Sequence, residues 1–329
     1  MLLTALLWLL GAVVLACLAI VGFFVFKTRR IAAWVERTMP PAGKFIDING
    51  NRIHYVDIGE GPPIVFLHGL GAQLHHFTHP LFKVFGPGYR LIALDRPGSG
   101  YSTRARGSTG RLPEQADIVC AFMEKLGLEK PVVVGHSLGG SVALAIAVEH
   151  PDAISGLVLL AALTHKEVDL RLEFKALFVS SPLKRFVLAH TISAPAGLKY
   201  GMKTMGLIFA PHSPPENYMT ENGGYIGLRP SHYYASATDF TVIEMDLPRL
   251  SERYNEIKVP SGLLFGGVDP IISLEVQGTP VKQKIEGLDL EIAEDLGHMP
   301  QFIGPEQVTA FIRRIAERAF ADRVSASNI

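Results

Sequence analysis

The segment Pro131-Val132-Val133-Val134-Gly135-His136-Ser137-Leu138-Gly139 decides the fold of this chain, because an apolar strand there enters a glycine-rich turn. The alanine-rich stretch 141–147 follows at once and is typical of a helix. A Gly-x-Ser-x-Gly turn between a strand and a helix strains the backbone of its serine, and the glycines remove Cβ atoms that would collide there. We therefore predict that Ser137 is a nucleophile held at the carboxyl edge of a sheet.

A serine hydroxyl needs a base within hydrogen-bond reach, and the base needs an acid that holds its tautomer. For this type of turn, the acid and then the histidine come later in the chain. The strand-like segment 261–266 leads to Asp269, and the segment 288–293 leads to His298. We predict Asp269 as the acid and His298 as the base. Asp295, in the same loop as the histidine, is the nearest alternative acid.

The negative charge that develops on a substrate oxygen needs two backbone N–H donors. The first predicted donor is Leu138, directly after the serine. The second is Leu70, in the turn His68-Gly69-Leu70-Gly71 that follows the strand-like segment 64–67. We expect His68 to brace this turn rather than to touch substrate.

With these motifs the chain resembles the α/β-hydrolase family from about residue 45 to residue 320. The resemblance rests on the turn 68–71, the stretch Asp95-Arg96-Pro97-Gly98-Ser99-Gly100-Tyr101-Ser102, the serine turn, Gly267-Val268-Asp269 and Gly297-His298. It implies an α/β fold with a mainly parallel eight-stranded sheet, helices on both faces and a helical cap. It also implies Ser137, Asp269 and His298 as the catalytic set, and it gives Asp95, Ser99 and Ser102 a structural role. Relatives that dehalogenate alkanes or open epoxides carry aspartate at the position of Ser137, so serine favours acyl transfer to water.

The N-terminal stretch Leu2–Phe26 carries no charged side chain. At about 1.5 Å per residue, such a stretch can cross a hydrocarbon core about 30 Å thick. A cleaved signal peptide is the alternative, but no basic residue precedes the apolar run. Lys27, Arg29, Arg30 and Arg37 follow it, which favours a cytoplasmic catalytic domain. We predict a single-pass membrane anchor over residues 1–26.

The remaining chain divides by composition. Residues 27–44 are predicted to form a juxtamembrane linker, because Pro40 and Pro41 resist helix and inner strand. Residues 45–162 are the first part of the core, beginning with a hairpin of segments 45–48 and 52–56. Residues 163–250 lack strand rhythm and are predicted to be the cap, and residues 251–329 complete the core. The apolar stretch Met202–Phe209 is expected inside the cap, with docking at a membrane surface as the alternative.

Several other functions find no support. The formal net charge is zero, which gives no electrostatic case for nucleic acid, and the two cysteines give no disulfide framework. His75, His76 and His79 lack a third ligand and a zincin glutamate, so we expect pocket or surface histidines and no metal. The glycine-rich segments match neither a phosphate loop nor a dinucleotide fingerprint, so no cofactor is implied. The oligomeric state stays open.

These features predict a membrane-anchored serine hydrolase that cleaves carboxylic esters through an acyl-enzyme. An anchor beside an apolar cap favours hydrophobic or lipid esters, and the layout is similar to that of membrane-bound monoacylglycerol lipases. The alternatives are hydrolysis of a carbon–carbon bond in vinylogous diketone acids, for which Arg229 or Lys203 would bind a carboxylate, and hydrolysis of lactones or amides. A catalytically silent ligand-binding receptor on the same fold is the alternative outside enzymes.

Overall fold

Eight strands form one sheet in the order β1-β2-β4-β3-β5-β6-β7-β8. The computed structural model describes residues 1–166 and 172–326. The strands are β1 (Lys44–Ile48), β2 (Asn51–Ile58), β3 (Pro63–Leu67), β4 (Arg90–Leu94), β5 (Val132–His136), β6 (Gly156–Leu160), β7 (Ser261–Gly266) and β8 (Asp289–Ala293). β2 is antiparallel to β1 and β4, and all other neighbouring strands are parallel. The mainly parallel eight-stranded sheet and its leading hairpin are confirmed.

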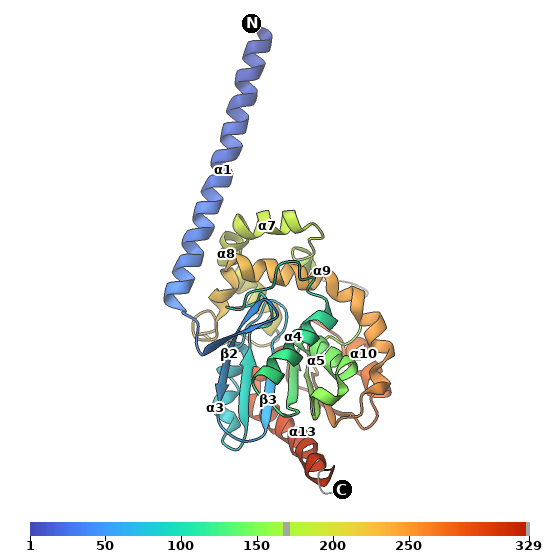
Figure 1. The fold of residues 1–329 in the computed structure, drawn as a ribbon. Helices are drawn as coiled ribbons and strands as arrows, with labels where there is room; N and C mark the ends of the chain where they lie inside the picture. The colour runs from blue at the N-terminus through green and yellow to red at the C-terminus, as the bar shows by residue number, and fades with distance from the viewer. Residues whose placement is uncertain (167–171, 327–329) are drawn as a thin grey trace.

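Helices cover both faces of this sheet (Figure 1). The core helices are α2 (His75–Thr78), α3 (Phe82–Phe85), α4 (Leu112–Lys125), α5 (Leu138–Glu149), α10 (Leu274–Gln277), α11 (Thr279–Lys284), α12 (Pro300–Ile303) and α13 (Pro305–Ala326). One buried cluster joins the sheet to α4 and α5, and a second joins it to α3 and α13. Because the central strands β5 and β6 are buried on both faces, they consist of apolar residues almost throughout.

A helical segment, called the cap below, lies between β6 and β7. It contains α6 (Leu172–Lys175), α7 (Pro182–His190), α8 (Ser193–Phe209), the 3-10 turn η2 (Gly224–Leu228) and α9 (Pro230–Glu252). Pro182 and Pro195 lie in the first turns of α7 and α8, where a missing N–H costs little. Residues 167–171 of the predicted cap and 327–329 of the predicted second core part lie outside the described residues.

The N-terminal helix α1 (Leu2–Thr38) is longer than the predicted anchor. It is the one helix among residues 1–166 and 172–326 that is long and apolar enough to cross a membrane. Its first part projects from the body, while Thr28, Ile31 and Val35 are buried. The predicted linker 27–44 is therefore wrong in part, because helix continues to Thr38 before Pro40 and Pro41 intervene. Apolar partners in the cap stabilise this continuation.

Candidate active site

Ser137 occupies the sharp turn between β5 and α5. Its backbone has φ 52° and ψ −122°, a conformation that strains a side chain-bearing residue. The turn can close because glycines flank it. A Cβ at Gly135 would collide with the carbonyl of Gly139, and a Cβ at Gly139 would collide with the carbonyl of Leu67. This packing explains both glycines of the motif and holds the hydroxyl at the carboxyl edge of the sheet.

The structure brings Ser137, His298 and Asp269 together from three separate loops. His298 Nε2 lies 3.1 Å from Ser137 Oγ, and His298 Nδ1 lies 2.8 Å from Asp269 Oδ2. The other carboxylate oxygen of Asp269 accepts hydrogen bonds from the amides of Ile271 and Ile272, at 2.7 and 3.2 Å. Since both oxygens of this buried carboxylate are engaged, the imidazole is held with Nδ1–H toward the acid and Nε2 toward the serine.

Asp295, the alternative acid, does not reach this arrangement. Its side chain is exposed, and its backbone carbonyl accepts a hydrogen bond from His212 Nε2 at 2.7 Å. The carboxylate beside His298 Nδ1 belongs to Asp269 instead.

The two predicted amide donors line the same cavity as Ser137. Leu138 is the first residue of α5, and Leu70 lies in the turn after β3. The backbone hydrogen bonds of the described segments include none donated by either amide, so both N–H groups are available to a ligand. The neighbouring Gly69 brings this turn against the serine, since a Cβ there would lie 3.1 Å from Ser137 Cβ.

The turn after β3 is held by a buried arginine. Arg96 Nε donates to the carbonyl of His68 at 2.9 Å, and Arg96 Nη2 donates to that of Gly69 at 3.1 Å. His68 Nδ1 donates to the carbonyl of Gly69, and its Nε2 accepts from the backbone amide of Arg96, both at 2.9 Å. Burial, followed by the charge of Arg96, keeps the pKa of His68 well below its usual value. His68 braces the turn as predicted.

The carboxylate of Asp95 holds the turn that follows β4 by accepting hydrogen bonds from backbone amides. It accepts from the amides of Leu74 and Tyr101 at 2.8 and 2.7 Å and lies 2.7 Å from His54 Nδ1. Ser102 Oγ donates to the carbonyl of Asp95 at 2.7 Å, and Ser99 is fully buried nearby. All these contacts are internal to the protein.

The comparisons with known proteins identify the family. A family model described as "alpha/beta hydrolase fold" matches residues 62–305. This chain belongs to the α/β-hydrolase fold family. By its fold and its relatives, the protein is a hydrolase.

Individual relatives share about a quarter to a third of their residues with this chain over the matched segments. The chain is 36% identical over 128 residues to the dihydrolipoyllysine-residue acetyltransferase component of the acetoin cleaving system of Cupriavidus necator, a match that covers 38% of the chain. It spans only 33% of that protein's length. It is 27% identical over 274 residues, 80% of the chain and 91% of the relative, to a 2-hydroxy-6-oxononadienedioate/2-hydroxy-6-oxononatrienedioate hydrolase of Burkholderia vietnamiensis.

Among solved structures, a membrane phospholipase A described as a bacterial virulence factor superposes with a TM-score of 0.66. The two chains are 23% identical, and the match covers 95% of this chain and 98% of the other. At this identity the likeness concerns the fold.

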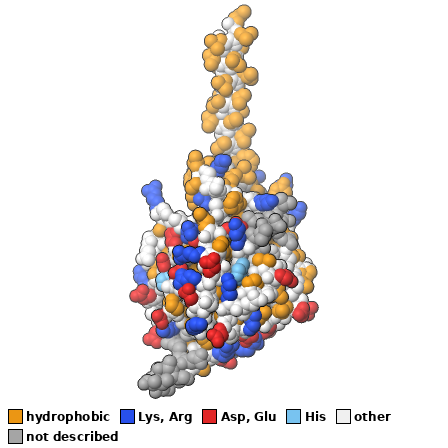
Figure 2. Space-filling view, turned by 90° about the vertical axis from the view of Figure 1, so that its right-hand side faces the viewer, with side chains coloured by type: hydrophobic (Ala, Val, Ile, Leu, Met, Phe, Trp, Pro, Cys, Tyr) orange, Lys and Arg blue, Asp and Glu red, His pale blue; other side chains and the backbone are white. Residues whose placement is uncertain are grey.

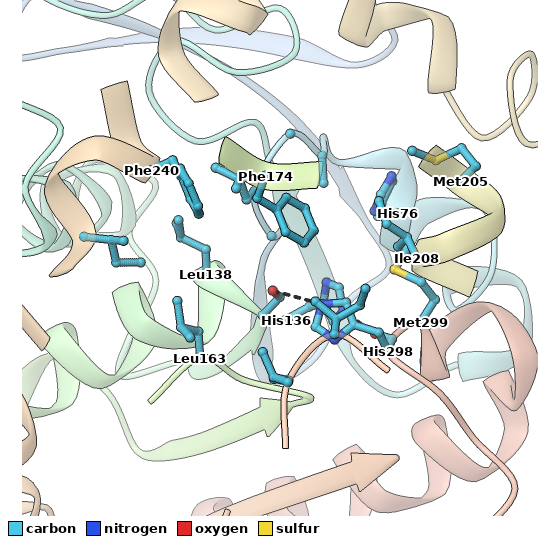
Figure 3. Close-up of a pocket in the computed structure, with 18 of the residues that line it drawn as sticks. His76, His136, Leu138, Leu163, Phe174, Met205, Ile208, Phe240, His298 and Met299 are labelled. Carbon is cyan, nitrogen blue, oxygen red and sulfur yellow. Dashed lines mark hydrogen bonds between the residues drawn. The ribbon is translucent and has the colours of Figure 1, made fainter. Parts of the chain in front are cut away.

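The cavity of this α/β-hydrolase lies between the core and the cap, and Ser137 and His298 line it. Figure 3 shows His298 with Phe174, Met205 and other wall residues around it. Its volume, about 140 Å³, matches a cavity that holds one benzene-sized apolar group. Core residues form one part of the wall: Leu138, Leu163, Ile271, Ile272 and Met299. Cap residues form the other: Phe174, Met205, Ile208, Tyr218, Phe240, Ile243 and Leu247. The described wall is thus apolar except for histidines, Ser137, the Tyr218 hydroxyl and Glu244.

The two basic residues named for a carboxylate-binding pocket lie elsewhere. Arg229 Nε is 3.0 Å from Glu36 Oε1, and its guanidinium stacks over the ring of Tyr101 at 4.3 Å. Lys203 is exposed on α8. Within the described part of the cavity wall, no lysine or arginine faces the serine.

Two histidines of the cavity were not singled out by sequence reasoning as parts of the catalytic site. His136 Nε2 donates to the carbonyl of His298 at 2.8 Å, and burial lowers the pKa of His136 to about 3. It is therefore a neutral support for the loop that carries the base. His76 Nε2 lies 2.9 Å from the hydroxyl of Tyr218, and burial lowers its pKa also to about 3. The position of His136 beside the serine was the available signal, whereas His76 had only its neighbouring histidines.

The three histidines considered for a metal site, His75, His76 and His79, lie close together in the fold. The rings of His75 and His79 lie 4.8 Å apart, on one face as their spacing predicts, while His76 points into the cavity. Among the described residues, no group of three or more histidine, cysteine, aspartate or glutamate side chains could hold a metal ion.

Proposed function

We propose that this protein is a membrane-anchored serine hydrolase that cleaves carboxylic esters with apolar acyl groups. The observation that carries the proposal is the hydrogen-bonded series from Ser137 through His298 to Asp269 at the base of an apolar cavity. A neutral His298 that donates through Nδ1 can accept the serine proton at Nε2.

The proposed reaction has two steps. His298 takes the proton of Ser137 while Oγ attacks the ester carbonyl, and the amides of Leu70 and Leu138 stabilise the oxyanion. The tetrahedral intermediate collapses, and His298 gives its proton to the leaving alcohol. Water then attacks the acyl-enzyme with His298 as base, and the carboxylic acid leaves as Ser137 recovers its proton.

The apolar wall supports the choice of substrate class. A charged or strongly polar acyl group would lose its hydration in this cavity without gaining partners among the described residues. Apolar acyl groups lose nothing comparable and gain contact with the cap and core walls. Monoacylglycerols and other hydrophobic esters fit this requirement.

The membrane proposal rests on α1, whose residues 2–23 are apolar or uncharged and all exposed. Lys27, Arg29 and Arg30 at the end of the run favour a cytoplasmic catalytic domain. Protease added to sealed inverted vesicles and to intact cells tests the orientation: digestion of the domain only in intact cells would contradict it.

A fluorophosphonate probe tests the enzymatic proposal. Wild-type protein in detergent should be labelled at residue 137, and Ser137→Ala should lose labelling and about 10⁶-fold in ester turnover. Ser155→Ala is the control, because Ser155 is a buried serine outside the cavity whose hydroxyl has no hydrogen-bond partner among the described residues. A wild-type protein that neither labels nor hydrolyses esters would favour a silent binding protein.

Hydrolysis of a carbon–carbon bond is the second candidate, since the relative from Burkholderia vietnamiensis that is 27% identical bears the name of a hydrolase of dioate substrates. A dioate carries two carboxylates, and the described cavity wall includes no lysine or arginine that would pair with them, while Glu244 in that wall is already paired with Lys166 at 3.5 Å. Wild-type enzyme should therefore turn over short and medium acyl esters but not a ring-cleavage diketone acid. The reverse preference would replace ester hydrolysis by the second candidate.

A further inference from the structure

The cap helix α7 exposes apolar side chains and buries a charged one, which is the reverse of the arrangement expected for a helix in water. Leu183, Phe186 and Val187 share one face and are exposed at 72%, 53% and 48%, whereas Arg185 is only 7% exposed. The guanidinium of Arg185 lies 5.6 Å from the centre of the Tyr234 ring on α9. An amphipathic helix of a soluble domain places its apolar stripe toward the core. The outward stripe of α7 therefore needs an apolar partner outside the protein.

The neighbouring helix α8 extends this apolar character. Leu198, Tyr200 and Met202 are each about half exposed. We call the exposed side chains of the two helices the cap apolar surface: Leu183, Phe186, Val187, Leu198, Tyr200 and Met202. Both helices lie at the end of the body from which α1 projects (Figure 1). In the space-filling view, hydrophobic side chains cover the projecting helix and continue onto the body at its base (Figure 2).

The attachment of α1 fixes where this surface lies relative to a membrane. Thr28 Oγ1 donates to the carbonyl of Thr191 between α7 and α8 at 2.6 Å. Ile31 and Val35 are buried in a cluster with Ala194 of α8. Because α1 is one continuous helix, no flexible segment separates the apolar run from these contacts. A bilayer around residues 2–26 would end close to Thr28, at the level of the cap helices.

The charges on the two helices match one type of membrane surface. The segment 182–209 contains Lys184, Arg185, Lys199 and Lys203 and no aspartate or glutamate. Lys184, Lys199 and Lys203 are exposed beside the apolar side chains, and Lys27, Arg29 and Arg30 are close in sequence to Thr28. Basic side chains around an apolar face favour the interface of a bilayer that contains anionic lipids.

We propose that α7 and α8 dock into the headgroup region of the bilayer that holds α1, with the cap apolar surface inserted among anionic lipids. This inference rests on the membrane anchor and deepens the proposed function. α8 also carries Met205 and Ile208 in the cavity wall. Docking therefore places membrane lipids against the same helix that borders the catalytic serine, so a lipid ester need not cross bulk water to reach it.

Site-specific fluorescence tests the docking without reference to activity. The full chain carrying Cys17→Ala and Cys120→Ala is given one cysteine, Phe186→Cys or Val84→Cys, and labelled with an environment-sensitive dye. Val84 is the matched control, since it is also an exposed apolar residue but lies on α3, remote from α1. In vesicles of phosphatidylcholine and phosphatidylglycerol, the dye at 186 should shift to the blue and be quenched by brominated lipid. Equal spectra at 186 and 84 would overturn the proposal.

Turnover gives the second measurement. The variant Leu183→Glu/Phe186→Glu should hydrolyse a vesicle-embedded monoacylglycerol about tenfold more slowly than wild type, because two carboxylates oppose insertion. It should match wild type on a short water-soluble ester, which reports the folded site. Val84→Glu should match wild type on both substrates. Vesicle turnover equal in the two variants would overturn docking, whereas a wild type inactive on every ester would overturn the proposed function and leave the fluorescence result standing.

Discussion

The two halves of the cap differ in what holds them. α9 is tied to the core by buried charges: Asp239 accepts from Arg96 Nη1 at 2.8 Å and from Arg104 Nη2 at 2.5 Å, and Asp246 pairs with Arg111. The described ion pairs include none that involves α7 or α8. These two helices pack on α9 and α1 and expose apolar side chains. α9 is thus tied to the core, while α7 and α8 are the helices that we propose to dock at a membrane.

The proposed catalytic side chains and the helices proposed to receive substrate from the membrane thus belong to different parts of the molecule. The side chains proposed for catalysis come from loops at the edge of the sheet, which hydrogen bonds hold in place. The cap contributes a mostly apolar part of the wall, with Glu244 and the Tyr218 hydroxyl as its polar members. Changes at the proposed catalytic side chains should therefore act on turnover, changes at the buried charges of α9 on stability, and changes in the cap wall on substrate choice.

The largest expected effect concerns the acid. Asp269→Asn should lower kcat about 10⁴-fold, because an amide at this position favours the wrong tautomer of His298. Ester turnover at saturating substrate measures the change. Asp295→Asn is the matched control and should leave kcat unchanged, since its side chain is exposed and separate from the imidazole. The opposite ranking of the two variants would move the acid to Asp295.

The next effect concerns the junction of α9 with the core. Asp239→Asn removes the carboxylate that faces two arginines, and it should lower the free energy of unfolding by about 3–5 kcal/mol. In the variant, the buried guanidinium of Arg96, whose side chain is 1% exposed, would stay charged without its carboxylate partner. Urea or thermal unfolding in detergent measures this.

An exposed ion pair supplies the control for that variant. Lys258 Nζ lies 3.9 Å from Glu286 Oε2, and both side chains are largely exposed. Glu286→Gln should change the unfolding free energy by less than about 1 kcal/mol. Similar losses in the two variants would mean that α9 is not anchored through its buried charges.

The smallest effect concerns the cap wall. Phe240→Ala enlarges the cavity on the side of α9, so the ratio of kcat/KM for a long over a short acyl ester should rise about tenfold. Phe178→Ala, at an exposed cap phenylalanine, should leave this ratio unchanged. An acyl-chain series measured in detergent compares the two. A ratio that does not respond to Phe240 would show that the cap wall does not select the acyl group.

Sequence reasoning predicted the three side chains that the structure brings together, because each carries a local signal. The serine turn requires glycine on both sides, and Asp269 and His298 follow recognisable strands in the expected order. Leu70 and Leu138 were placed by the same motifs and stay predictions as oxyanion donors. His136 was given no role from the sequence because a buried histidine that only supports a loop leaves no pattern in a single chain, whereas His76 was expected as a pocket or surface histidine and lies in the cavity wall.

Local periodicity, backbone demands and length were enough to predict the α/β fold, the hairpin and the apolar run of α1 from the chain alone. The tertiary structure decided the rest: the helix through the predicted linker, the pairing of Arg96 with Asp239, and the outward apolar face of α7. The physical reason is that these features depend on contacts between residues far apart in the chain. Arg96 and Asp239 are separated by 143 positions, and Thr28 and Thr191 by 163. No local pattern specifies which partner such a side chain will meet.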